Sequence, residues 1–254
     1  ALNVAGRRIE MWIVDEPGQG DGSATYFVTP VLFSSAGYGL FADDNPEGEF
    51  DLNRAGDGWH RYRRAGQTAS FVVSFAGDVP ALIARRTAMI GGLEPAPAWG
   101  YRPWISKNSY ETQGEAEAAM DGMRARDLPF GVIVLEAWKG RSETGEFNSF
   151  SPTRWPDAEA FMARCAAEGV KVVLWQVPIL HPSSPWFAKA AELGYLVRDP
   201  EGNVSLREQW LAGNGNIDFF TPEATAFYKD LLRPVVRMGV AGFKADDGEV
   251  IKPT

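Results

Sequence analysis

The sequence predicts an α/β fold in which a parallel sheet follows a β-rich N-terminal segment. From residue 98 onward, short apolar strands alternate four times with helical patterns, whereas residues 1–92 contain short strands separated by Gly, Pro and Asp. Apolar strands that alternate with helices indicate a parallel sheet covered by helices. The pattern fits either a doubly wound sheet or the first half of a (β/α)8 barrel, and no glycine-rich phosphate turn follows the first strand.

The first 92 residues are predicted to form strands and one helix. The expected strands are rich in aromatic and β-branched residues. They cover residues 8–14, 25–28, 37–41, 58–62 and 70–75. A helix is expected over residues 80–89, and the Gly- and Pro-rich residues 91–97 are typical of a linker. We therefore predict one domain over residues 1–92 and a second over residues 93–254.

The second domain is predicted from its change of hydrophobic period. Apolar runs predict strands over residues 99–105, 132–135, 170–177 and 238–241. Apolar residues at helical spacing predict helices over residues 115–126, 157–168 and 185–193. A further helix is expected to begin at Thr221 and Pro222, because threonine is a favoured cap and proline is favoured in the first turn.

The composition excludes several classes of function. The net charge is −8, without the basic stripe that a nucleic-acid surface needs. Cys165 is the single cysteine, so neither an internal disulfide nor a thiolate metal site is expected. Neither of the two histidines lies in a nucleophile motif, which favours carboxylate chemistry without a cofactor. No signal peptide or membrane span is evident, so we expect a cytoplasmic protein with a truncated N-terminus and no membrane partner.

Carboxylate, lysine and aromatic side chains gather at the ends of the predicted parallel strands. They are Trp104 on the first strand, Glu136 and Trp138 after the second, Trp175 on the third, and Lys244, Asp246, Asp247 and Glu249 at the fourth. The carboxyl ends of barrel strands meet at one rim. Sugar hydroxyls bind carboxylates and sugar C–H faces pack on aromatic rings, so the set predicts a cleft for an oligosaccharide or α-glycoside.

Two other interpretations of these residues stay open. Taken alone, each of the aromatic residues, such as Trp138 and Trp175, favours a place in the core, whereas the whole set favours a carbohydrate cleft. A metal site made of Asp246, Asp247 and Glu249 is disfavoured, because successive strand residues point to opposite faces of a sheet.

Five segments in order along the chain carry a family resemblance. Residues 243–249 have the pattern F-K-x-D-x-G-E, and the others are residues 37–41, 132–138, 155–175 and 217–224. Together they resemble glycoside hydrolase family 31, which contains retaining α-glycosidases and related transglycosidases; the F-K-x-D pattern resembles the branch with α-xylosidases. The resemblance implies the first half of a (β/α)8 TIM barrel, preceded by the end of an N-terminal β-sandwich domain.

The resemblance also implies site roles. Asp246 matches the nucleophile, which forms a covalent glycosyl-enzyme. Lys244 matches a neighbour that contacts sugar hydroxyls, and Glu136 stands where the family usually has an aspartate that binds them. Trp175 matches an aromatic wall of the same subsite. The remaining substrate-binding candidates are Trp138, Trp104 and Asp15, the last matching an aspartate lent by a sandwich loop.

A retaining mechanism needs a second carboxyl group roughly 5–5.5 Å from the nucleophile. The family takes this acid/base aspartate from a later strand, beyond Thr254. We therefore expect a fragment that is inactive and aggregation-prone alone, because a half-barrel leaves a strand edge unpaired. A transglycosidase and a non-catalytic carbohydrate-binding relative remain alternatives, and the sugar, its linkage and homo-oligomer formation stay open.

Overall fold

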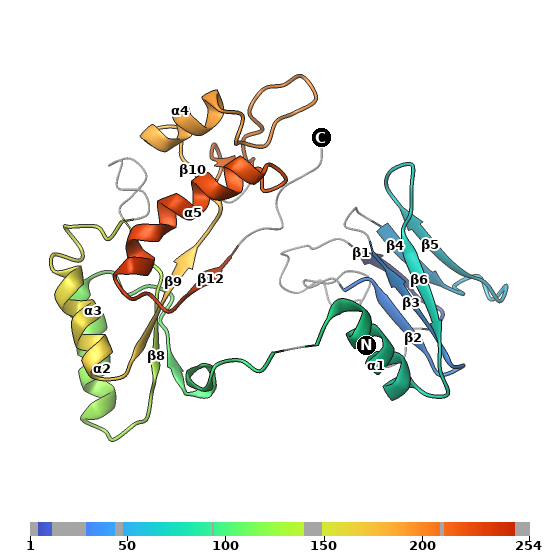
Figure 1. The fold of residues 1–254 in the computed structure, drawn as a ribbon, viewed down its shortest axis with the longest axis horizontal. Helices are drawn as coiled ribbons and strands as arrows, with labels where there is room; N and C mark the ends of the chain where they lie inside the picture. The colour runs from blue at the N-terminus through green and yellow to red at the C-terminus, as the bar shows by residue number, and fades with distance from the viewer. Residues whose placement is uncertain are drawn as a thin grey trace. The chain divides into compact units, whose positions relative to one another are not determined.

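A computed structural model describes residues 5–11, 29–43, 48–92, 94–139, 149–208 and 211–246. The chain divides into two compact units, Ala1–Pro95 and Ala96–Thr254 (Figure 1). The boundary lies within the Gly- and Pro-rich stretch that the sequence marks as a linker. Each unit has its own sheets and its own core.

The first unit is a β-sandwich of two antiparallel sheets. One sheet has the order β1 (Arg8–Met11), β4 (Gly48–Leu52), β5 (His60–Arg64), and the other β2 (Val31–Ser34), β3 (Tyr38–Ala42), β6 (Phe71–Phe75). Phe50 and Leu52 from the first sheet pack with Leu32 and Leu40 from the second, so side chains of both sheets form one core. Helix α1 (Val79–Ile90) follows these strands, with Asp78 as its cap.

Strand β4 was not predicted, because charged residues interrupt its apolar pattern. Glu49 is its second residue and is only 9% exposed. Arg8 of β1 and Arg63 of β5 form ion pairs with the Glu49 carboxylate, from the strands on either side. Partners distant in sequence therefore make this carboxylate compatible with a buried position.

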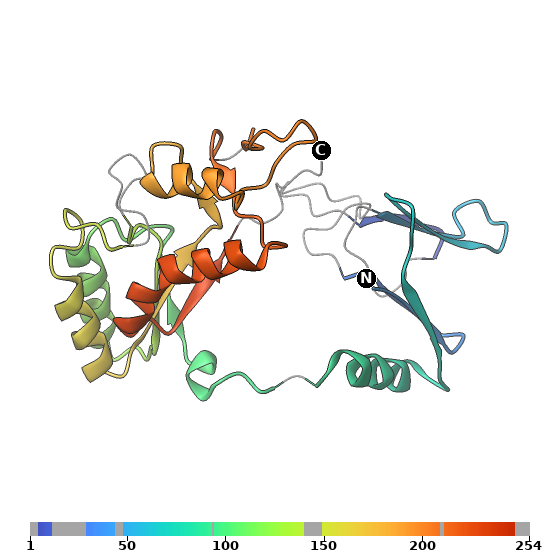
Figure 2. The ribbon, with the colours of Figure 1, turned by 45° about the horizontal axis from the view of Figure 1, so that its top comes forward.

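The second unit is built on a four-stranded parallel sheet. Its order is β7 (Trp104–Ile105), β8 (Val132–Leu135), β9 (Lys171–Gln176) and β12 (Gly242–Ala245), the same as the order along the chain. The connections contain α2 (Gln113–Arg124), α3 (Ala158–Ala167) and α5 (Pro222–Arg237). Figures 1 and 2 show α2 and α3 side by side next to β8.

The strand order decides between the two predicted architectures. In a doubly wound sheet the order reverses at a switch point. Here each strand is added on the same side of the preceding one. Residues of α2, α3 and α5 also join a single core with one face of the sheet. The prediction of a partial (β/α)8 barrel behind a β-sandwich is therefore confirmed.

Two strand predictions are wrong in their bounds. The last strand is β12, not residues 238–241, because Met238 caps α5 and Gly239, with a φ of +100°, turns the chain before the strand begins. The first strand has only two residues, because Ala98–Tyr101 forms a 3-10 turn between Pro97 and Pro103. The predicted strand at residues 25–28 lies outside the described residues.

Between β9 and α5 the chain makes a longer excursion. It contains β10 (Ile179–Leu180) paired with β11 (Gly215–Asn216), and helix α4 (Pro185–Glu192). Leu180, Leu196 and Ile217 pack there with Tyr228 of α5 in a second core. Among the described residues, no helix has the length and apolar character needed to cross a membrane.

Phe161 of α3 is fully buried in the main core of the second unit. Replacing it with alanine is expected to lower the free energy of unfolding by about 3–5 kcal/mol, because the apolar transfer energy is lost and a cavity remains. Denaturant unfolding of the complete protein measures this change. Val236→Ala on α5, at a side chain that is 48% exposed, is the control and is expected to stay within about 0.5 kcal/mol of wild type.

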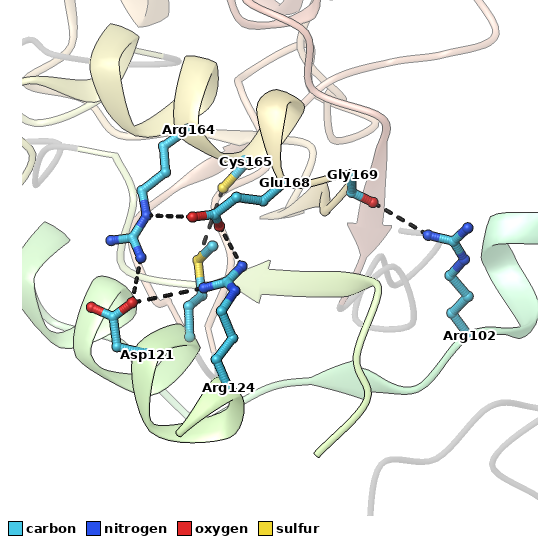
Figure 3. Close-up of polar contacts among 8 residues, drawn as sticks. Arg102, Asp121, Arg124, Arg164, Cys165, Glu168 and Gly169 are labelled. Atoms are coloured by element: carbon cyan, nitrogen blue, oxygen red, sulfur yellow. Dashed lines mark hydrogen bonds and ion pairs between the residues drawn. The ribbon is translucent and has the colours of Figure 1, made fainter. Parts of the chain in front are cut away.

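Helices α2 and α3 are joined by ion pairs on their outer surfaces. Asp121 and Glu168 each contact both Arg124 and Arg164, so the four residues form a closed network between the two helices (Figure 3). Beneath the network, the Cys165 thiol lies 4.0 Å from the Met120 sulfur. The thiol is therefore covered by the network above and by the core below.

Burial raises the pKa of Cys165 to about 12. The thiolate is the reactive form, so the folded protein is expected to resist a maleimide at pH 8 and to react at Cys165 after unfolding. Peptide mapping of the alkylated chain checks this. Rapid labelling of Cys165 in the folded protein would show that the α2–α3 interface opens.

Candidate active site

The two faces of the parallel sheet carry different sets of side chains. Leu135 and Leu174 belong to the core that contains the helix residues. Their strand neighbours Val134 and Val173 instead lie in a small cluster with Trp99. Because successive strand residues alternate between faces, the second set points away from the helices, toward the interior of the barrel.

Four of the predicted site residues share this interior face at the carboxyl ends of the strands. Glu136 follows Val134 by two residues, and Trp175 follows Val173 by two residues. Phe243 of β12 packs against the helix-facing core, so Lys244 and Asp246 lie on the opposite face. In the paired register, Lys244 stands beside Trp175. Three adjacent strands therefore supply one group of polar side chains.

Two short contacts connect these side chains. The indole N–H of Trp175 donates to Asp246 Oδ2 at 2.6 Å. The Lys244 ammonium forms an ion pair with Glu136 Oε1 at 2.7 Å. The Glu136 side chain is 19% exposed and that of Lys244 is 46% exposed, so the pair faces solvent-accessible space. The backbone is fixed as well, because Asp246 N donates to Gln176 O at 3.0 Å.

Lys139 and Gln176 also lie at the site, although the sequence analysis assigned neither of them to it. Lys139 Nζ donates to Gln176 Oε1 at 3.0 Å and lies 5.2 Å from the centre of the Trp175 ring. Burial lowers the pKa of Lys139 to about 8. The sequence feature that could have indicated a site role for Lys139 is its place near a strand end, three residues after Glu136.

Trp138 occupies a different place from the one predicted. It is 0% exposed and belongs to the helix-facing core, where its indole N–H donates to Trp175 O at 2.7 Å. A ring with no exposed surface offers no face to a sugar. The prediction that Trp138 contacts the substrate directly is therefore wrong. Trp138 instead supports the strand that carries Trp175.

Trp104 lies at the wrong end of the sheet for the predicted role. It pairs in register with Val132, the first residue of β8, so it stands at the amino ends of the strands. Its ring stacks on that of Trp99, with the two ring centroids 6.1 Å apart, and its N–H donates to Gly100 O at 3.1 Å. The 3-10 turn shortened the predicted strand and removed Trp104 from the rim.

Three acidic candidates are not placed. Asp15, Asp247 and Glu249 lie outside the described residues. Within the part of the chain that the structure describes, no group of three His, Cys, Asp or Glu side chains is arranged to hold a metal ion.

The chain was compared with known proteins. Residues 94–254 match the model of the glycosyl hydrolases family 31 TIM-barrel domain. The α-xylosidase XylQ of Lactiplantibacillus pentosus is 27% identical over 97% of this chain and 32% of its own length. The α-xylosidase of Emericella nidulans gives the same figures. The chain thus spans about a third of the length of these curated relatives.

Solved structures show the same fold. The dextranase of Flavobacterium johnsoniae, a variant complexed with isomaltotriose, has a TM-score of 0.86 at 23% identity, covering 98% of this chain and 32% of that protein. A cycloalternan-forming enzyme from Listeria monocytogenes has a TM-score of 0.84 at 20% identity, covering 99% of this chain and 27% of that protein. With the family model matching more than half of its residues, the chain belongs to glycoside hydrolase family 31.

Proposed function

We propose that the complete protein is a retaining, exo-acting α-glycosidase in which Asp246 is the nucleophile. The observation that supports this most directly is the placement of the Asp246 carboxylate. It lies on the interior face at the end of β12, oriented by the Trp175 N–H and beside the Lys244–Glu136 pair. Covalent catalysis by a carboxylate requires such an oriented oxygen within a group of sugar-binding side chains.

In the proposed first step, Asp246 attacks the anomeric carbon while the bond from that carbon to the leaving oxygen breaks. Trp175 holds Oδ2, which leaves Oδ1 to form the new bond. The leaving oxygen takes a proton from a carboxylic acid, and water then cleaves the glycosyl-enzyme with the same group acting as base. We assign this acid to another part of the complete protein, because Glu136 is engaged with Lys244.

Lys244 and Glu136 are proposed to bind hydroxyl groups of the sugar that is cleaved. An ammonium donates to hydroxyl oxygens, and a carboxylate accepts from hydroxyl protons, so the pair can hold two neighbouring hydroxyls. Trp175 supplies an apolar plane beside them. The α-xylosidases among the relatives make an α-xyloside the first substrate to test.

Transfer of the sugar to another sugar is a second candidate outcome at the same site. An isomaltosyltransferase of Sporosarcina globispora is 24% identical over 89% of this chain and 24% of its own length. Product analysis at increasing acceptor concentration separates the two reactions, because a transferase forms longer saccharides where a hydrolase releases free sugar. Sugar binding without any turnover would instead favour a non-catalytic relative.

The proposed nucleophile can be tested by trapping. A mechanism-based 5-fluoro-α-glycosyl fluoride, incubated with the complete protein, is expected to leave one sugar on the peptide that contains Asp246, as identified by mass spectrometry. Attachment to another carboxylate would overturn the assignment. Asp230, a paired surface carboxylate on α5, serves as an internal control and is expected to stay unlabelled.

A further inference from the structure

Lys139 is a lysine whose position at the site has no assigned role. It follows β8 and is held there by an antiparallel bridge between its backbone and that of Phe150. Its side chain is largely buried, and its ammonium meets both last residues of β9, at the Gln176 side chain and at the Trp175 ring. A lysine ammonium is strongly hydrated, so burying it is costly unless it makes compensating contacts.

Both residues that Lys139 contacts also contact Asp246. Trp175 donates its N–H to the Asp246 carboxylate at 2.6 Å. The backbone carbonyl of Gln176, whose side chain accepts from Lys139, accepts from the Asp246 backbone N–H at 3.0 Å. Lys139 is therefore connected to the Asp246 carboxylate through one residue, Trp175. It is connected to the Asp246 backbone through one residue as well, Gln176. The Gln176 side chain also interacts with Tyr228 of α5, which anchors it from the other side.

We propose that Lys139 is a positioning residue for the nucleophile Asp246, acting through Trp175 and Gln176. This inference rests on the proposed function. A cation beside the face of an indole is attracted by the negative face of the ring and restricts its tilt. The direction of the Trp175 N–H depends on that tilt. Because this N–H holds the Asp246 carboxylate, the tilt also sets the orientation of the carboxylate. Lys139 thus acts on the rate of bond formation at the anomeric carbon.

The charge of Lys139 is compatible with this role at neutral pH. Burial lowers its pKa to about 8, so the ammonium form predominates at pH 7. Among the site residues that the structure describes, Glu136, Lys244 and Asp246 are also charged, and Glu136 and Lys244 neutralise each other in an ion pair.

The test compares Lys139→Met, Lys139→Gln and Lys139→Arg in the complete protein. The first two remove the cation, and Met keeps much of the aliphatic length; the third keeps the cation. With an activated α-glycosyl fluoride as substrate, Met and Gln are expected to lower kcat/KM by about 10-fold or more. The Kd for the free product sugar is expected to stay within about twofold, and Arg is expected to restore most of the rate.

Lys189→Met is the matched control, because it removes a lysine that pairs with Glu192 on α4 instead. It is expected to leave kcat/KM unchanged. The proposal is overturned if Lys139→Met and Lys139→Gln turn over at the wild-type rate, or if Lys139→Arg is as slow as both. The trapping experiment distinguishes failure of this proposal from failure of the proposed function. If Asp246 is labelled normally but the Lys139 variants keep the wild-type rate, only the positioning role of Lys139 is rejected.

Discussion

Asp246→Ala is expected to lower kcat/KM of the complete protein by at least about 10³-fold on an aryl α-glycoside. The loss follows because no other group on β12 presents a carboxylate to the interior face: Ala245 lies on the helix side and Lys244 is cationic. Steady-state kinetics measures the change, and the thermal unfolding midpoint checks that the variant folds.

An external anion separates a missing nucleophile from a damaged site. In Asp246→Ala, azide is expected to enter the space of the lost carboxylate and convert an activated α-glycoside to the β-glycosyl azide. That product has the opposite anomeric configuration, because azide attacks from the face that Asp246 occupied. Asp230→Asn on α5 is the control, with unchanged kinetics expected. Full activity of Asp246→Ala would contradict the assignment.

Trp175→Phe is expected to lower kcat/KM by about 10- to 100-fold. The substitution keeps an aromatic plane but removes the N–H that donates to Asp246 Oδ2 at 2.6 Å. A hydrogen bond to a charged group contributes about 1.5–3 kcal/mol, and each 1.4 kcal/mol corresponds to about a factor of ten in rate. Kinetics with the same activated substrate measures the loss.

The comparison of two Trp175 variants identifies which property of the ring matters. Trp175→Ala removes both the donor and the apolar plane, so it is expected to raise the Kd for the product sugar in addition to slowing the reaction. Trp175→Phe is expected to leave that Kd nearly unchanged. Trp186→Phe on α4 is the matched control. Equal effects of both Trp175 variants on rate and affinity would argue against a separate role for the N–H.

Much of the second unit could be predicted from its sequence, because its elements have strong local patterns. Residues 132–135 are continuously apolar and form β8 with the predicted bounds. Helix α4 begins after Ser184, whose hydroxyl accepts from Trp186 N as a cap. The strand ends that carry Glu136, Trp175 and Asp246 could be located because each follows a run of this kind.

The remaining features depend on partners distant in sequence. Glu49 is buried because arginines on two other strands pair with it, which no local pattern shows. Trp138 and Trp175 are both tryptophans near the carboxyl end of a predicted strand, yet one is core and the other reaches Asp246. Trp175 lies within β9 and follows the alternation of that strand, whereas Trp138 lies beyond the end of β8, where the alternation of strand residues no longer applies.

The turn at Gly239 fixes the alternation of every side chain on β12. Four residues, 238–241, separate the end of α5 from the first residue of the strand. One residue more or fewer in this turn would exchange the two faces of β12, directing Phe243 inward and Asp246 toward the helices. The excursion between β9 and α5 is free of this constraint, because its length does not set the parity of any of these strands. An inserted residue in the excursion would therefore leave the two faces of β12 in place, whereas one in the short turn after α5 would exchange them.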